Sequence, residues 1–260
     1  MIEDRFAELE GVTLRYVDTG GAGPALVLLH ANTGSVEAWE PQIAAFANAG
    51  LRVIAFDRRG WGKSFANADT GPQPSSAAED IEALADHLAL AEFHLAGVAG
   101  GGFCALDYAA WKPGRLRSLT AAATSAQLSE SEIAAYRRRI EFDGFRALPP
   151  HHREISASYR GGNPQGVARW IEIDHASQQK AAPAQPLRTP NTYAKLAEIS
   201  TPTLVIAGCA DAVSPPSMMR LWAAKSPNAQ FALVPEAGHA VSWEQPEAFN
   251  KLLLAFVAEH

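Results

Sequence analysis

The 260-residue sequence has few of the features that mark secreted, membrane-spanning or nucleic-acid-binding proteins. It contains only two cysteines, Cys104 and Cys209, too few for a disulfide framework, and their apolar neighbours predict two small buried side chains. No apolar run approaches the roughly 18 residues of a membrane span, and the acidic N-terminus has no signal-peptide core, so we expect a cytoplasmic protein. The net charge of −6, without a long run of one sign, argues against nucleic acid or an anionic membrane as a partner.

Motifs for a cofactor or a metal ion are also missing. Gly62-Lys63-Ser64 ends like a phosphate-binding loop, but Asp57 stands where that loop needs its first glycine. Residues 100–105 match G-x-G-x-x-A, yet the following apolar run, 116–123, ends in alanines where a dinucleotide site needs an acid. No two histidines or carboxylates have metal-ligand spacing. We therefore expect no cofactor and no metal, and a small-molecule substrate as the partner.

Alternating strands and helices predict an α/β fold with a mostly parallel, eight-stranded sheet covered by helices on both faces. The first two expected strands, 7–9 and 13–17, form an antiparallel hairpin. The others are short, continuous apolar runs, as in strands buried on both faces: 25–29, 52–56, 93–96, 116–123, 203–207 and 230–234. The expected helices between them cover residues 39–48, 75–90, 101–112, 216–224 and 246–258. Ser75 or Ser76 caps the second of these, with Glu79 placed for a capping box.

The alternation stops between about residues 126 and 190. This part contains helical stretches at 130–142, 152–159 and 166–178, separated by proline- and glycine-rich segments. We expect residues 126–190 to form a small helical cap over the C-terminal edge of the sheet, inserted into a core domain of residues 1–125 and 191–260. Five cap residues are candidates for contacting substrate, although a solvated helix face is the commoner role of such residues: Tyr136, Arg138, Arg139, Trp170 and His175. Four histidines without a motif are expected at the surface: His87, His94, His151 and His152.

The most informative stretch, residues 93–103, lacks the residue that its pattern requires. An apolar strand turns within a few residues into a helix, with glycines on both sides of the turn, which is the pattern of a nucleophile elbow. Gly97-Val98-Ala99-Gly100-Gly101 keeps the frame of G-x-S-x-G but has alanine at its apex. Because a methyl group cannot attack a carbonyl carbon, Ala99 marks a nucleophile position without a nucleophile.

Two polar residues complete the order of a catalytic triad. Asp211 follows the strand at 203–207, and His239 follows the strand at 230–234. Ala99, Asp211 and His239 therefore stand in the order nucleophile, acid, histidine that α/β hydrolases use. An aspartate in this position accepts a hydrogen bond from the histidine and fixes its tautomer. Either residue alone is usually just solvated, but the shared position after strands favours a catalytic dyad.

Taken together, these motifs resemble the α/β-hydrolase superfamily, particularly enol-lactonases, meta-cleavage-product (carbon–carbon bond) hydrolases and related esterases. The resemblance covers essentially the whole chain and rests on residues 28–34 (LLHANTG), residues 57–64 (DRRGWGKS), the elbow, Asp211, and Gly238-His239. It implies an oxyanion hole made by the backbone N–H of Gly100 and that of Asn32, with Thr33 as the alternative to Asn32. Ala31 replaces the glycine usual after His30, and residues 57–64 are expected to be a structural turn.

Three hypotheses can explain Ala99. In the first, the chain is an inactivated variant of a serine hydrolase. In the second, alanine is native, and the dyad of His239 and Asp211 acts as a base on water or on an acidic C–H or O–H of a keto substrate, with hydrolytic, lyase or isomerase chemistry. In the third, the protein is a non-catalytic receptor for a small molecule on a hydrolase scaffold. No substitute nucleophile is evident among Cys104, Cys209 and Ser125.

Overall fold

The computed structural model describes residues 3–179 and 185–260, and its centre is one nine-stranded sheet. The strands follow the order β1-β2-β4-β3-β6-β7-β8-β9, and the short β5 pairs with β2. Their bounds are β1 Arg5–Leu9, β2 Val12–Asp18, β3 Ala25–Leu29, β4 Arg52–Phe56, β5 Phe65–Ala66, β6 Phe93–Val98, β7 Leu116–Ala122, β8 Thr203–Gly208 and β9 Ala229–Val234. From β4 to β9 every neighbouring pair is parallel, whereas β2 is antiparallel to β1, β4 and β5.

The predicted mostly parallel sheet is confirmed, and β5 makes it one strand larger than predicted. β5 has only two residues, pairing Phe65 with Thr13 and Ala66 with Val12. So short a strand has no alternating pattern for a sequence to show. By contrast, β3 and β4 have the bounds that their continuous apolar runs predict, because both are buried on two faces.

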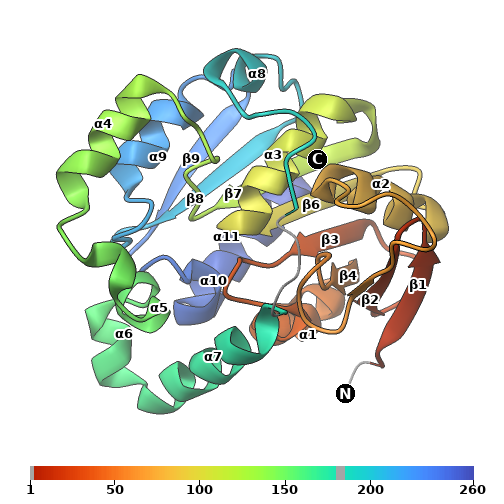
Figure 1. Cartoon of the computed structure of the whole chain (residues 1–260), viewed down its shortest axis with the longest axis horizontal. Helices are drawn as coiled ribbons and strands as arrows, with labels where there is room; N and C mark the ends of the chain where they lie inside the picture. Colours follow the sequence, from red (N-terminus) through yellow and green to blue (C-terminus); the bar gives the residue numbers. More distant parts are fainter. Residues whose placement is uncertain (1–2, 180–184) are drawn as a thin grey trace.

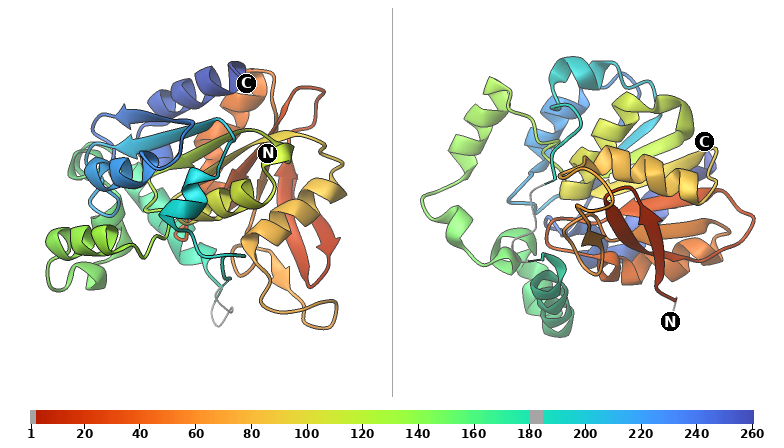
Figure 2. Two further views of the ribbon diagram at one scale, coloured as in Figure 1. Left: turned by 90° about the horizontal axis from the view of Figure 1, so that it is seen from above. Right: turned by 45° about the vertical axis from the view of Figure 1, so that its right-hand side comes forward.

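Helices cover both faces of the sheet (Figures 1 and 2). One face carries α1 Glu40–Asn48, the 3-10 helix Val36–Trp39 before it, and α11 Pro246–Ala258. The other carries α2 Ala77–His87, α3 Gly100–Trp111, α8 Tyr193–Ala197 and α9 Pro216–Ala223. Successive strand residues alternate between the two cores: Val27 and Leu29 pack with the α2 and α3 side, and Leu26 and Leu28 with the α1 and α11 side.

The helix α2 illustrates how the sequence sets an element's start. Ser76 accepts a hydrogen bond from the backbone N–H of Glu79 at 3.2 Å, and the Glu79 carboxylate accepts one from the N–H of Ser76 at 2.9 Å. This is the predicted capping box, with Ser76, not Ser75, at the cap. The helix ends at His87, three residues earlier than predicted, and His87 is exposed as expected.

The segment between β7 and β8 is helical, and it contains no strand within residues 126–179 and 185–190. Its helices are α4 Ser131–Ile140, α5 Pro150–Glu154, α6 Ala157–Gly162 and α7 Pro164–Ser177. They lie along one side of the sheet in Figure 1, drawn in green. The single helix predicted over 152–159 is wrong: α5 ends at Glu154, and Ser156 caps α6 by accepting from the N–H of Tyr159. Residues 180–184 of the predicted cap, and residues 1–2 of the N-terminus, lie outside the described residues.

Two further features differ from the sequence-based expectations. His94, expected at the surface, lies in β6 and is 1% exposed, with Nδ1 2.8 Å from Ser118 Oγ, and burial lowers its pKa to about 4. Cys104 is buried as expected, whereas Cys209 is exposed because it follows β8 in a surface turn. Of the other two histidines expected at the surface, His152 is exposed and His151 is half-buried.

Among the described residues, no helix combines the length and apolar character needed to cross a membrane.

Candidate active site

The turn from β6 to α3 has the geometry of a nucleophile elbow with alanine at its apex. Ala99 has φ 50° and ψ −109°, a conformation that L-residues rarely adopt. Packing enforces it: a Cβ on Gly97 would lie 2.7 Å from the backbone nitrogen of Gly102, and a Cβ on Gly101 would lie 2.8 Å from the carbonyl oxygen of His30. The glycines therefore let α3 approach β6 and the loop after β3 closely, which fixes the methyl group of Ala99 on the sheet's C-terminal edge.

The structure brings Asp211 and His239 together. His239 Nδ1 lies 2.8 Å from Asp211 Oδ2, and both side chains are buried. Asp211 Oδ1 accepts the backbone N–H groups of Val213 and Ser214, each at 2.8 Å. These contacts hold the carboxylate in one orientation, and so the imidazole ring keeps Nδ1 toward Asp211 and turns Nε2 toward the cavity.

The pKa of His239 is raised above the ordinary value of 6.5. Burial acts in the other direction, but the charge and the hydrogen bond of Asp211 outweigh it, and the carboxylates of Glu154 and Glu244 add to the effect. A histidine of this kind is a stronger base than a solvated one, and its neutral form can accept a proton near physiological pH.

Three backbone N–H groups beside the elbow and in the loop after β3 have no acceptor among the described residues. A turn from Ala31 to Gly34, closed by a 3.1 Å hydrogen bond, carries Asn32 and Thr33. The N–H groups of Asn32, Thr33 and Gly100 donate to no acceptor in the described part of the chain. Asn32 and Thr33, the two alternatives for one predicted donor, thus both keep a free N–H, and so does Gly100, the other predicted donor, in the first turn of α3.

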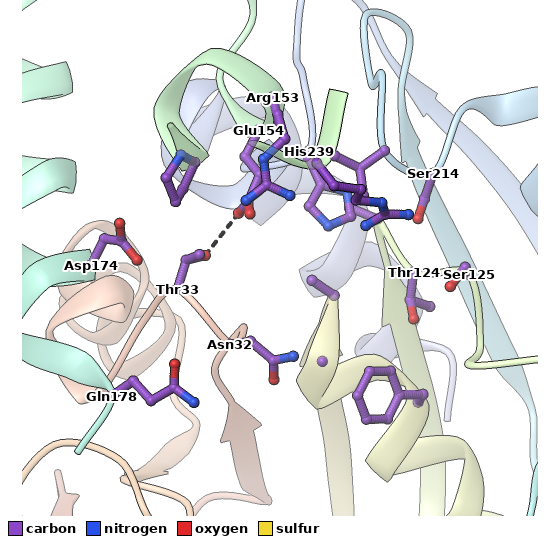
Figure 3. Close-up of a pocket in the computed structure, with 17 residues that line it drawn as sticks. Asn32, Thr33, Thr124, Ser125, Arg153, Glu154, Asp174, Gln178, Ser214 and His239 are labelled. Atoms are coloured by element: carbon purple, nitrogen blue, oxygen red, sulfur yellow. Dashed lines mark hydrogen bonds between the residues drawn. The ribbon is translucent and has the colours of Figure 1, made fainter. Parts of the chain in front are cut away.

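A cavity of about 400 Å³ joins these groups (Figure 3). Its lining from the core comprises Asn32, Thr33, Ala99, Gly100, Phe103, Ala123, Thr124, Ser125, Val213, Ser214 and His239. Its lining from the helical segment comprises Arg146, Pro150, Arg153, Glu154, Asp174 and Gln178. The residues predicted for catalysis and for the oxyanion hole all line the cavity except Asp211, which contacts His239 from behind. The five cap candidates do not line it: Trp170 lines a smaller neighbouring cavity, and Tyr136 hydrogen-bonds Ser217.

Sequence reasoning missed Glu154, a residue of the helical segment that contacts the loops carrying His239 and Thr33. Its backbone oxygen accepts the N–H groups of His239 at 2.7 Å and Ala240 at 3.1 Å, and its carboxylate accepts the hydroxyl of Thr33 at 2.8 Å. Burial, together with the negative charge of Glu154, raises the pKa of Asp174, which also lines the cavity from the helical segment. No motif marks Glu154, because the contact depends on how α5 lies against the loop after β9.

Neither Cys104 nor Ser125 replaces the missing nucleophile. Cys104 lies on the buried side of α3, and burial raises the pKa of its thiol. Ser125 lines the cavity, but its hydroxyl accepts from Arg137 Nη2 at 2.8 Å and has no base beside it among the described residues. Within residues 3–179 and 185–260, no three His, Cys, Asp or Glu side chains are grouped to hold a metal ion.

Comparisons with known proteins agree with this architecture. Residues 26–252 match the alpha/beta hydrolase family. The chain is 30% identical to 3-oxoadipate enol-lactonase 1 of Acinetobacter baylyi, over 90% of this chain and 88% of that protein. It is 28% identical to a 2-hydroxy-6-oxononadienedioate/2-hydroxy-6-oxononatrienedioate hydrolase of Burkholderia vietnamiensis, over 95% and 92% of the two chains. Among solved structures it resembles a thermophilic esterase from Thermogutta terrifontis, with a TM-score of 0.82, 27% identity and 98% coverage of both chains.

The family match spans most of the chain, and the curated relatives are aligned over nearly their whole length. Their names are those of an enol-lactonase and a hydrolase. The chain therefore belongs to the α/β-hydrolase family of enzymes.

Proposed function

We propose that the protein is an α/β-hydrolase-fold enzyme that acts on a small carbonyl compound. This compound is an ester, a lactone, or a keto compound whose carbon–carbon bond is cleaved. His239 is its general base, Asp211 orients that base, and the N–H groups of Gly100 and Asn32 form the oxyanion hole. Ala99 holds the nucleophile position, so no covalent intermediate forms there. One observation carries this proposal: the 2.8 Å contact between His239 and Asp211 beside a cavity that also exposes Ala99 and Gly100.

In the hydrolytic form of this mechanism, water takes the place of the serine hydroxyl. His239 Nε2 accepts a proton from a water beside the methyl group of Ala99, and the water oxygen bonds to the carbonyl carbon. The carbonyl π electrons move to its oxygen, whose charge the N–H groups of Gly100 and Asn32 stabilise. When the bond to the leaving group breaks, that group takes the proton from the imidazolium of His239. A substrate with an acidic C–H or O–H can instead lose its proton directly to His239, which gives lyase or isomerase chemistry.

We propose further that residues 126–190 form a cap that selects the substrate, over a core of residues 1–125 and 191–260. The support is that Arg146, Arg153, Glu154, Asp174 and Gln178 face the cavity from the helical segment. The cavity wall opposite the elbow is therefore charged and polar. A polar or ionised carbonyl compound suits this wall better than an apolar ester.

Turnover of a substrate panel tests the proposal. The panel contains aryl acetates, enol-lactones and vinylogous 1,5-diketones, each assayed in water enriched in ¹⁸O. The protein is compared with His239→Ala and with His152→Ala, a matched control because His152 is an exposed cap histidine. We expect turnover that is lost in His239→Ala and kept in His152→Ala. Incorporation of ¹⁸O then separates hydrolysis from lyase or isomerase chemistry.

The variant Ala99→Ser separates the remaining hypotheses. If the chain is an inactivated serine hydrolase, the unmodified protein has a negligible rate on an aryl acetate. Ala99→Ser then hydrolyses this ester with a burst and is labelled at position 99 by a phosphonate. If the dyad acts alone, the unmodified protein turns over a keto or lactone substrate, and the serine brings no gain. Tight binding of a small molecule without turnover in either protein would contradict the proposal and support a receptor. Phosphonate labelling of the unmodified protein would also contradict it, because another nucleophile would have to exist.

A further inference from the structure

Arg58, just after β4, is a buried cation with no carboxylate partner in the described part of the chain. Its side chain is 3% exposed, and its contacts are neutral: Nη2 donates to Asn32 Oδ1 at 2.7 Å, and the guanidinium lies 4.4 Å from the centre of the Trp61 ring. Its Nε is buried and finds no acceptor among the described residues. Burial accordingly lowers the pKa of Arg58. A buried charge without an opposite charge costs folding free energy, so a packing role alone does not explain Arg58.

The neighbouring Arg59 shows the usual arrangement of a buried arginine. Its guanidinium donates twice to Asp80, at 2.7 Å and 3.1 Å, and it is equally buried. Two consecutive arginines therefore have different environments. Arg59 is neutralised inside the fold, and Arg58 is held against the loop that carries Asn32.

The hydrogen bond from Arg58 orients the side-chain amide of Asn32. A guanidinium has only donors, so the amide atom that faces it must be the oxygen, and the nitrogen is directed away from it. Asn32 Nδ2 donates to no group within residues 3–179 and 185–260, and Asn32 lines the cavity. Figure 3 shows the Asn32 side chain among the residues that line the cavity.

The same amide lies against the residue after the elbow's apex. A Cβ on Gly100 would meet Asn32 Oδ1, the acceptor of the Arg58 hydrogen bond, and would lie 2.7 Å from Asn32 Cγ and 3.3 Å from Arg58 Nη2. Trp61 Nε1 donates to the backbone oxygen of Asn32 at 2.8 Å, which fixes the main chain of the loop. The side-chain oxygen and the main chain of Asn32 are therefore both held, beside Gly100.

We propose that the side-chain Nδ2 of Asn32 is a third donor to the substrate oxyanion, and that Arg58 is the residue that positions it. The ligand class is the negatively charged oxygen of a tetrahedral intermediate or an enolate. The positive charge of Arg58, acting on Oδ1, polarises the amide and strengthens its N–H groups as donors. This inference rests on the proposed function, because it adds a group to the same oxyanion hole. Removal of one such donor lowers kcat by about 10²-fold or more.

A binding experiment without turnover tests the geometry. Methylphosphonate, a tetrahedral oxyanion mimic, is titrated into ¹⁵N-labelled protein, and the side-chain amide resonances of Asn32 are followed together with the backbone amide of Gly100. We expect both to shift along one binding curve. In Arg58→Met the Asn32 shift is lost, and the dissociation constant rises about tenfold. Absence of binding, or a shift of Gly100 with Asn32 unmoved, would overturn the inference even if the catalytic proposal is correct.

The variants Asn32→Ala and Asn32→Asp distinguish a donor from a structural contact. The aspartate keeps the contact to Arg58 as an ion pair, so thermal stability is retained, but an acceptor replaces Nδ2. We expect kcat on the substrate found in the panel to fall about 10²-fold in both variants with KM changed little. Arg59→Met, the matched control, lowers the melting temperature yet keeps kcat. A kcat in Asn32→Asp within twofold of the parent would refute the donor role. If no substrate turns over, the catalytic proposal fails and the phosphonate titration still decides this one.

Discussion

Replacing Asp211 by asparagine tests the dyad with little change of shape. The asparagine side chain keeps an oxygen for the N–H groups of Val213 and Ser214, which Asp211 Oδ1 now accepts at 2.8 Å. Its nitrogen must then face His239 Nδ1, where the carboxylate accepts at 2.8 Å. Because that nitrogen only donates, Nδ1 must accept, and the ring proton moves to Nε2. The base would then carry its proton on the side that faces the substrate.

The expected effect on kcat is large. A histidine in the wrong tautomer costs about 10⁴-fold in kcat, equivalent to about 5 kcal/mol of transition-state stabilisation. The pKa of His239 falls at the same time, since the charge and hydrogen bond of Asp211 are what raise it against burial. Folding changes much less, because the variant keeps two of the three hydrogen bonds and buries one charge fewer.

Two measurements check this prediction. Steady-state kinetics on the panel substrate give kcat, and ¹⁵N NMR of the imidazole gives the tautomer and the pKa of His239. Asp69→Asn is the matched control, because Asp69 is an exposed carboxylate that does not line the cavity, and we expect kcat to change less than twofold. A kcat in Asp211→Asn within tenfold of the parent, with the His239 tautomer unchanged, would refute the assigned roles.

Further predictions concern pH and the elbow. Since His239 must be neutral to act as a base and its pKa is raised, kcat/KM should rise with pH through a midpoint above 6.5, and a midpoint at or below 6.5 would contradict the pairing with Asp211. The stabilisation that this pairing gives the folded protein has the opposite trend with pH. It is fully present below the pKa of His239 in the unfolded chain and disappears as the pH rises through the pKa of His239 in the folded protein. Urea unfolding at several pH values measures this change in the free energy of unfolding. Gly101→Ala should lower the free energy of unfolding by about 3 kcal/mol, because its Cβ would lie 2.7 Å from the backbone carbonyl carbon of Leu29. Gly161→Ala in α6 is the control: the space around Gly161 is open, so this variant should be neutral or stabilising by up to about 1 kcal/mol.

The core of the fold could be predicted because its elements carry local signals. The runs that became β3 and β4 are continuous and apolar, and Ser76 and Glu79 mark the start of α2. The elements that the sequence did not indicate are short: β5, α8 Tyr193–Ala197 and α10 Val241–Glu244. A two- to five-residue element has too few positions for periodicity and is defined by its tertiary contacts. His94 is a different failure, since its place inside an apolar run already indicated burial.

The candidate site divides in the same way. Asp211 and His239 could be named because each follows a strand, and strand ends meet at one edge of a parallel sheet. Glu154, Arg153 and Asp174 could not, because their approach to the cavity depends on how the helices α5 and α7 lie over that edge. Arg58 belongs to a motif that was assigned to structure, and only its lack of a carboxylate partner within the described residues separates it from Arg59.

The elbow and the dyad are not equal evidence for activity. Packing alone maintains the strained turn at Ala99, since the neighbouring glycines force α3 against β6 and the loop after β3 whatever residue stands at the apex. The elbow would therefore survive in a chain without catalytic function. The pairing of His239 with Asp211 has no such packing cause: it buries a carboxylate and a titratable ring in contact with each other, and apolar side chains of similar size in their place are often neutral or stabilising. We therefore propose proton transfer as the reason for this buried pair beside a cavity with free N–H groups, and the asparagine variant at position 211 tests that proposal directly.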